Sequence, residues 1–216
     1  MARTSGGPWR VMVSARMETA SSTRPGGARV GKVVAVETLA PGFLIAMPQL
    51  GDPNFHRTVV FVFQHGPEGA RGLVLNRPGP FTLREVADGQ SLPVAPRLAG
   101  QKIFVGGPVE PQRGFVLHDR TGVDEKQPLS DGLFLSETVD ALQVLLADSE
   151  GNLRFYLGYS GWGPGQLEKE LAAGAWLFTE AAPAAVLSGS PQTLWDDTLR
   201  ALGVDPAMLQ PGGGMN

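Results

Sequence analysis

The sequence predicts a mixed α+β fold, and three observations support that prediction. The chain has 29 Gly and 18 Pro among 216 residues, and residues that cost roughly 1 and 3 kcal/mol in a helix interior exclude a coiled coil or a plain helical bundle. The first half contains short apolar runs rich in β-branched and aromatic residues, which are typical of buried strands. The second half contains apolar residues three and four positions apart, which is the spacing of amphipathic helices.

The composition excludes several classes of protein. A hydrophobic content of 42% is too high for a disordered chain, and the absence of cysteine excludes disulfides, thiol nucleophiles and iron–sulfur clusters. The apolar runs fall far short of the roughly 20 residues that a membrane-spanning helix needs. A formal net charge of -3 argues against a protein that wraps nucleic acid, because phosphate neutralisation needs clustered Lys and Arg. We therefore expect a mildly acidic soluble protein with no membrane contact and no bound cofactor.

Charge divides the chain into segments of different character. Residues 1–32 contain six basic side chains against the single acid Glu18, although the whole chain is acidic. We expect this stretch to be either a disordered basic leader or an overcalled start, with Met12 and Met17 as alternative initiation sites. Residues 33–210 are expected to form a single domain, and the Gly-rich residues 211–216 a mobile tail.

The expected strands follow from the apolar runs and from the turn residues between them. Residues 43–47 and 58–63 are such runs, and they predict strands buried on both faces near the middle of a sheet. A dense turn cluster at residues 48–54 separates the two. Further strands are expected at residues 73–75, 103–105, 115–117 and 154–158.

The expected helices follow from apolar spacing and from signals at their ends. Helices are predicted at residues 81–87, 139–146, 166–173 and 194–202. Ser136 and Thr138 are the N-cap candidates for the second of these, because their hydroxyls can accept a hydrogen bond from a free backbone N–H. Gly203 is expected in the C′ position after the last helix, where glycine accepts a left-handed backbone.

The strongest candidate site is the corner where the strand at 73–75 runs into Asn76, Arg77 and Pro78. The Asn76 amide can both donate and accept hydrogen bonds, and the Arg77 guanidinium can grip a carboxylate or phosphate with two nitrogens. This pattern favours an anion-binding corner. A structural alternative stays open, in which Asn76 caps the turn and Arg77 pairs with an acid such as Glu110.

Two of the three histidines supply further candidate side chains. His65 and His118 each follow an expected core strand, so both can emerge at sheet ends, where ligands often bind. In the alternative, each ring only hydrogen-bonds a turn backbone. The histidines do not recur at the i, i+4 spacing of a helical metal site, and no metal site is predicted.

Two glycine-rich turns can bring bare backbone N–H groups toward an anion. Gly106 and Gly107 form the first, and the second, at residues 161–166, precedes a helix whose dipole would assist. Neither matches a dinucleotide-binding fingerprint. Ser160 stands in a context close to a nucleophile elbow, but Trp162 occupies the place of the second glycine, which argues against a hydrolase. The tryptophans are expected to lie in the core or at an interface.

Four segments in this order resemble the AlgH/YqgE family. They are PGFLIAMP at 41–48, GLVLNRP at 72–78, GGPV at 106–109 followed by RGFVLH at 113–118, and LGYSGWGPGQLE at 157–168. The resemblance covers approximately residues 39–209 and leaves the basic leader outside. Family members tend to end in a glycine followed by a histidine, whereas this chain ends in GGGMN, so no role of that histidine carries over.

The resemblance implies a cytoplasmic bacterial protein of mixed α and β structure. It also implies a branched β-sheet that includes a small barrel-like portion and is surrounded by helices. The family is often labelled a transcriptional regulator, from a link to alginate production, without a recognised DNA-binding motif. This sequence adds no support for direct DNA contact, since we find no helix-turn-helix candidate with a basic second helix.

Three functions stay open at this point. The favoured one is a non-enzymatic regulatory or ligand-sensing protein that takes an anionic small molecule in a pocket lined by His65, Asn76, Arg77, Gly106, Gly107 and His118. The second is an enzyme in which His65 or His118 acts as general base beside the Asn76–Arg77 corner. The third is a nucleic-acid- or protein-interaction module.

Overall fold

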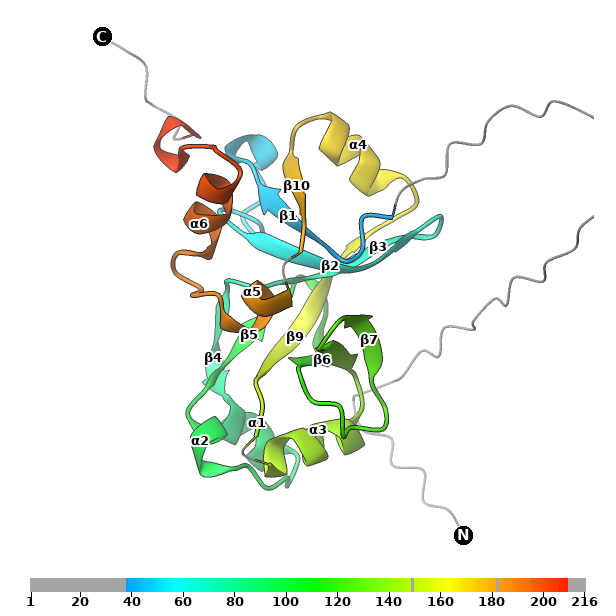
Figure 1. Ribbon diagram of the computed structural model, residues 1–216, viewed down its shortest axis with the longest axis vertical. Coiled ribbons are helices and arrows are strands. Elements are labelled where there is room, and N and C mark those ends of the chain that lie inside the picture. The colour runs from blue at the N-terminus through cyan, green and yellow to red at the C-terminus, as the bar shows by residue number, and fades with distance from the viewer. Residues whose placement is uncertain (1–37, 149, 182, 210–216) are drawn as a thin grey trace, which may run out of the picture.

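A computed structural model describes residues 38–148, 150–181 and 183–209 (Figure 1). The predictions for residues 1–32 and 211–216 lie outside these ranges. The described strands are β1 (Gly42–Ala46), β2 (Val59–Gly66), β3 (Gly69–Val74), β4 (Pro78–Thr82), β5 (Lys102–Val105), β6 (Val109–His118), β7 (Gln127–Ser130), β8 (Leu133–Ser136), β9 (Leu153–Trp162) and β10 (Trp176–Glu180). The helices are α1 (Leu83–Gly89), α2 (Pro96–Ala99), α3 (Val139–Ala147), α4 (Gln166–Ala172), α5 (Pro183–Ser188) and α6 (Leu194–Ala201), with short 3-10 turns η1 (Pro48–Leu50) and η2 (Pro206–Leu209).

The described strands form one branched sheet. Its main path runs β10-β1-β2-β3-β9-β6-β8-β7, and β5 with β4 leaves this path at β9. β9 is the branch point because its C-terminal end pairs with β3, whereas Tyr156 and Leu157 pair with both β5 and β6. The β5–β9 pair is parallel and the other pairs are antiparallel. The sheet curls into a half-barrel, so the α+β class and the branched, barrel-like sheet are confirmed.

Hydrophobic clusters fill the space between the sheet and the helices. Phe115 and Tyr156 point to one face, where they join the core that includes Trp195 of α6. Val116 and Phe155, which alternate with them along β6 and β9, join a second cluster under α1, α2 and α3. In Figure 1, α4 lies at one end of the molecule and α1–α3 at the other. None of the helices in the described ranges has both the length and the apolar character needed to cross a membrane.

β1 and β2 confirm the prediction of strands buried on both faces. Every residue of β1 is buried, as are residues 59–63 of β2. The reason is their position, since β1 lies between β10 and β2 within the sheet and separate apolar clusters cover its two faces. The runs expected at 103–105, 115–117 and 154–158 lie in β5, β6 and β9, and β6 and β9 each extend to 10 residues. The run expected at 73–75 overlaps β3, which ends at Val74.

Four strands, β4, β7, β8 and β10, are missing from the sequence-based prediction. β4 contains Pro78 and Pro80, which lack an N–H for a sheet ladder, and it tolerates them because it pairs with β5 alone. The start of the helix predicted at residues 81–87 is wrong, because β4 includes residues 81 and 82. α1 begins only at Leu83, because the Thr82 hydroxyl and the Glu85 carboxylate form a capping box there.

The ends of α3 and α6 follow local sequence signals. Thr138 caps α3 with its hydroxyl, which accepts from a backbone N–H at 3.1 Å, whereas Ser136 lies in β8. Gly203 has a φ of +76° just after α6, and its N–H bonds to the carbonyl of Arg200 at 2.9 Å. The expected C′ role of Gly203 is therefore confirmed.

Glu170 ties α4 to the sheet. One carboxylate oxygen accepts from the indole N–H of Trp162 on β9 at 2.9 Å and from that of Trp176 on β10 at 2.8 Å. Gln166 donates to the other oxygen at 2.8 Å. Both indoles are buried, so the expected core role of these tryptophans is confirmed, and the turn before α4 carries a structural anchor.

Candidate functional site

Asn76 braces the chain that leads into β2. Its Oδ1 accepts from the N–H of Val59 and its Nδ2 donates to the carbonyl of Arg57, both at 2.9 Å. The Asn76 side chain therefore satisfies one backbone donor and one backbone acceptor of the segment before β2. Neither partner belongs to the turn that Asn76 was expected to cap in the structural alternative; the amide instead bonds a loop that lies 17 and 19 positions earlier in the sequence.

Arg77 holds the same loop through its carbonyl groups. The guanidinium Nη1 donates to the carbonyl of Asn54 at 2.7 Å and to that of Pro53 at 3.4 Å, and Nη2 lies 3.5 Å from the carbonyl of His56. The alternative partner, Glu110, instead accepts from Arg113 at 3.1 Å. The expected Arg77–Glu110 pair is therefore wrong, because β6 turns Glu110 toward a cation on its own strand.

We expect Asn76→Ala to lower the free energy of unfolding by about 2 kcal/mol, because it leaves the buried N–H of Val59 without a partner. Urea denaturation followed by circular dichroism measures the change. Asn54→Ala is the matched control, since the Asn54 side chain is exposed and its loss should cost less than about 0.5 kcal/mol. Equal losses in the two variants would contradict the bracing role.

Gly106 and Gly107 lie where the connection from β5 to β6 crosses β9. A Cβ on Gly106 would stand 2.3 Å from the carbonyl oxygen of Gly158, and a Cβ on Gly107 would stand 2.2 Å from the carbonyl carbon of Tyr159. Only glycine permits this approach of backbone to backbone. The Gly106 carbonyl also accepts from the fully buried Ser160 hydroxyl at 3.2 Å, which gives Ser160 a structural partner in mid-strand.

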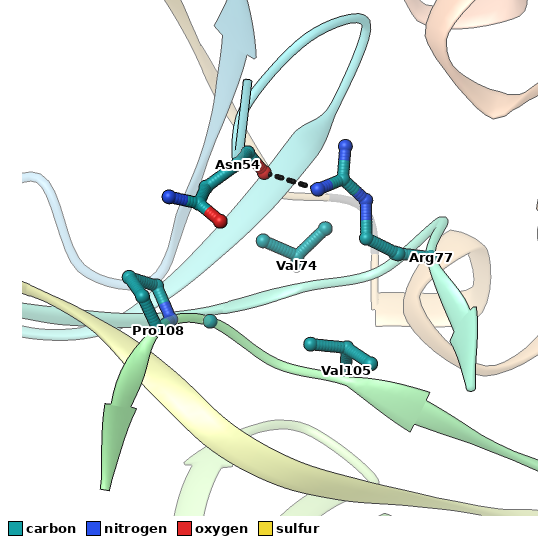
Figure 2. A pocket seen from close by; sticks show the side chains of 6 residues that line it. Asn54, Val74, Arg77, Val105 and Pro108 are labelled. Carbon is teal, nitrogen blue, oxygen red and sulfur yellow. Dashed lines mark hydrogen bonds between the residues drawn. The ribbon is translucent and has the colours of Figure 1, made fainter. Parts of the chain in front are cut away.

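A hollow of about 50 Å³ opens beside the Asn76–Arg77 corner. It is lined by Asn54, Val74, Arg77, Val105, Gly107 and Pro108 (Figure 2). Val74, Val105 and Pro108 supply apolar walls, and Arg77 stands at the rim with its guanidinium turned toward the Asn54 carbonyl (Figure 2). The structure therefore brings Arg77 and Gly107 to one place, with Asn76 and Gly106 next to them in the chain.

His65 lies away from this hollow, on β2 beside α4. Its Nδ1 accepts from the N–H of Leu39 at 3.2 Å, and its Nε2 bonds the Glu168 carboxylate at 2.9 Å. The side chain is only 2% exposed. A backbone hydrogen bond at Glu168, followed by the contact with His65, lowers the pKa of that carboxyl. His65 therefore joins β2 to α4.

His118 is the last residue of β6 and lies opposite Leu153 of β9. It is completely buried, its Nδ1 accepts from the N–H of Arg120 at 3.3 Å, and its Nε2 bonds the Ser136 hydroxyl at 3.0 Å. Burial lowers the pKa of His118 to about 4, although the charge of Asp119 acts in the opposite direction. Both histidines thus accept from a backbone N–H, and neither lines the hollow. Within the described ranges, no three His, Asp or Glu side chains are placed to hold a metal ion.

Arg71 is a half-buried cation that was not among the predicted site residues. Its guanidinium carbon lies 4.5 Å from the ring centre of Tyr159, 5.4 Å from that of Phe63 and 5.7 Å from that of Phe115. Its Nε and Nη2 are buried without a hydrogen-bond partner among the described residues. Cation–π contacts with the three rings therefore stabilise the guanidinium charge. The signal was present, because Arg71 alternates with Leu73 and so shares its core-facing side of β3.

Comparison with known proteins finds bacterial relatives along most of the chain. A UPF0301 protein of Myxococcus xanthus is 59% identical over 181 residues, which cover 84% of this chain and 100% of the relative. The solution structure of the AlgH protein from Pseudomonas aeruginosa is similar with a TM-score of 0.68 and 36% identity, over 86% of this chain and 100% of that one. A crystal structure from Corynebacterium diphtheriae shares the fold, with a TM-score of 0.61 and 22% identity over 81% and 88% of the two chains.

The family model described as AlgH-like matches residues 43–207. This range contains the Asn76–Arg77 corner, the crossing of Gly106 and Gly107 over β9, and α4 with its tryptophan anchor. It therefore includes almost all of the described fold. On this match and on the identity to the Myxococcus relative, the chain belongs to the AlgH-like family.

Proposed function

We propose that this protein is a non-enzymatic ligand-sensing protein that binds the anionic group of a small molecule at Arg77 and serves a regulatory role in the bacterial cytoplasm. The observation that carries the proposal is that the Arg77 guanidinium bonds backbone carbonyls and has no carboxylate partner among the described residues. It stands at the rim of the hollow and donates to backbone carbonyls. No ion pair of the described residues includes it, so its charge is free to attract an anion.

The size of the hollow limits what it can hold. A volume of about 50 Å³ suits a phosphate or a carboxylate group rather than a whole metabolite. The remainder of the ligand would extend over the rim, where Val105 is 36% exposed. An anionic group seated between Arg77 and the Gly107 backbone would therefore leave an apolar portion of the ligand in contact with β5.

The two histidines favour binding over catalysis at this site. A general base must come within hydrogen-bond reach of the proton that it removes. Neither His65 nor His118 lines the hollow, and both rings are engaged with protein partners. The enzyme alternative therefore lacks a base beside Arg77 among these two side chains.

A thermal-shift screen tests the proposal with phosphate, sulfate, citrate and adenosine nucleotides as probes. We expect at least one probe to raise the Tm of the wild-type protein, and we expect Arg77→Ala to lose that increase, because the guanidinium supplies the charge-assisted hydrogen bonds. Arg77→Lys should keep part of it. Each increase is measured against the Tm of the same variant without probe, since loosening the 53–57 loop lowers the Tm by itself.

Arg84→Ala is the matched control, because Arg84 is an exposed arginine on α1. Its probe-dependent increase should equal that of the wild type. An increase that persists unchanged in Arg77→Ala would contradict the site, and the absence of any increase in the wild type would contradict the proposed function.

A further inference from the structure

A second and larger cavity borders the loop that Asn76 and Arg77 hold. Its volume is about 150 Å³, which is the size of cavity that accepts a single benzene ring. It is lined by Ala46, Pro48, His56, Arg57, Trp195, Pro206 and Leu209. These residues come from the end of β1, from η1, from the loop before β2, from α6 and from η2, so the cavity exists only in the folded chain.

The walls of the cavity are apolar, and its polar groups, the Arg57 guanidinium and the His56 ring, belong to the loop before β2. Trp195 is buried and its indole N–H donates to the carbonyl of Ala46 at 2.9 Å, which fixes the ring in the wall. The Arg57 guanidinium carbon lies 4.4 Å from the centre of that ring. The Arg57 side chain is 40% exposed, and His56 beside it is exposed, so both can meet a molecule that enters from solvent.

The hydrogen bonds of Arg57 leave part of its guanidinium available. One nitrogen, Nη2, bonds both carboxylate oxygens of Asp196, at 2.8 and 2.9 Å. Within the described ranges, Nε and Nη1 bond no protein acceptor. Asp196 therefore orients the guanidinium over Trp195 while other donors of the same fork stay open to a carboxylate.

The backbone at Arg57 is strained, and the Asn76–Arg77 corner maintains the strain. Arg57 has a φ of +53°, a left-handed conformation that costs a non-glycine residue of order 1 kcal/mol or more. Asn76 donates to the carbonyl of Arg57 at 2.9 Å, and Arg77 approaches that of His56 at 3.5 Å. Strained residues that the surrounding structure holds in place tend to lie at ligand clamps.

We propose that this cavity binds a small carboxylic acid with an apolar body of about one ring. The carboxylate bonds the open edge of the Arg57 guanidinium, with His56 alongside, and the apolar body packs against Trp195, Pro206 and Leu209. Asn76 and Arg77 are positioning residues of this site, because they hold the loop that carries His56 and Arg57. The site is separate from the hollow at Arg77.

Isothermal titration of the full chain with sodium benzoate and with benzamide tests the proposal. The two probes share a ring, but only benzoate carries the charge. We expect benzoate to bind about tenfold more tightly than benzamide, because hydrogen bonds to an ionised acceptor are about twice as strong. We expect Arg57→Gly to lower the affinity for benzoate to that for benzamide, with the Tm near the wild-type value, since glycine relieves the positive φ.

Two further variants make the result specific. Leu209→Trp should fill the cavity and lower the affinity for both probes. Arg200→Gln, which removes an exposed cation of α6, should leave both affinities unchanged. The proposal is overturned if benzoate does not bind at millimolar concentration, if Arg57→Gly binds it as the wild type does, or if Leu209→Trp leaves binding unchanged. Arg57→Gly should keep the phosphate or sulfate response assigned to Arg77, so failure at one site is distinguishable from failure at the other.

Discussion

Gly107→Ala is expected to lower the free energy of unfolding by about 4 kcal/mol or more, a loss that only a few mechanisms produce. The methyl group would stand 2.2 to 2.4 Å from three backbone atoms of Tyr159 and Ser160. Backbone cannot move aside as the end of a flexible side chain can. The connection from β5 to β6 would have to lift off β9, and it would take with it the strand pairs that meet at the branch point.

Urea denaturation and the yield of folded protein on size exclusion measure this effect. Gly89→Ala is the matched control, because a Cβ on Gly89 would meet nothing within 4 Å. Since Gly89 lies in α1, alanine there should leave the stability unchanged or raise it by about 0.5 kcal/mol. A Gly107→Ala protein that unfolds at the same urea concentration as Gly89→Ala would show that the crossing relaxes freely, which our account does not allow.

Lowering the pH from 7 to 4 is expected to decrease the free energy of unfolding by about 3 kcal/mol through the protonation of His118 alone. Burial lowers the pKa of His118 in the folded state from 6.5 to about 4, so between these values the unfolded chain binds the proton and the folded chain does not. The contribution of His118 to the free energy of unfolding is therefore fully present above pH 6.5. It decreases as the pH falls to about 4 and changes little below that.

The hydrogen bonds of His118 explain why the ring resists a proton. The Ser136 hydroxyl donates to the carbonyl of Glu125 at 3.0 Å, so it accepts from the N–H at Nε2 of His118. Nδ1 then has no hydrogen and accepts from the N–H of Arg120. A proton on Nδ1 would face that N–H donor. Lys126 and Arg120 also disfavour the charged ring, whereas Asp119 favours it.

The measurement is the free energy of unfolding in urea at several pH values between 4 and 7. His118→Gln should be less stable at pH 7 but should show a shallower dependence on pH, because glutamine does not titrate. His56→Gln is the control for the loss of a histidine at an exposed position. The same slope in wild type and His118→Gln would rule out His118 as the source.

Much of the fold could be predicted because its signals are local. The apolar runs of β1 and β2, the hydroxyl of Thr138 and the glycine at 203 each act within a few residues of their position in the chain. β4 could not be predicted, because Pro78 and Pro80 mark a turn unless an edge strand is available to accommodate them. The short strand β10 likewise depends on β1, a partner that lies far away in the sequence.

The candidate site was predictable in its residue types but not in its contacts. Asn76 and Arg77 were identified from their chemistry, and the structure places them against the 53–57 loop rather than beside the two histidines. Arg57 carried no sequence signal, because its importance comes from a backbone conformation and from Asp196, which is 139 positions away. Arg71 did carry one, as a charge in a core-facing position of a strand.

By itself, the sequence determined the α+β class, the buried strands and the helix ends, because hydrophobic period and capping chemistry act over a few residues. Only the tertiary structure decided which polar groups meet. His65 bonds Glu168 across 103 positions, and a Cβ on Gly106 or on Gly107 would collide with the backbone of β9. Hydrogen bonds and close contacts between distant segments depend on the relative placement of whole strands, and no local pattern encodes that placement.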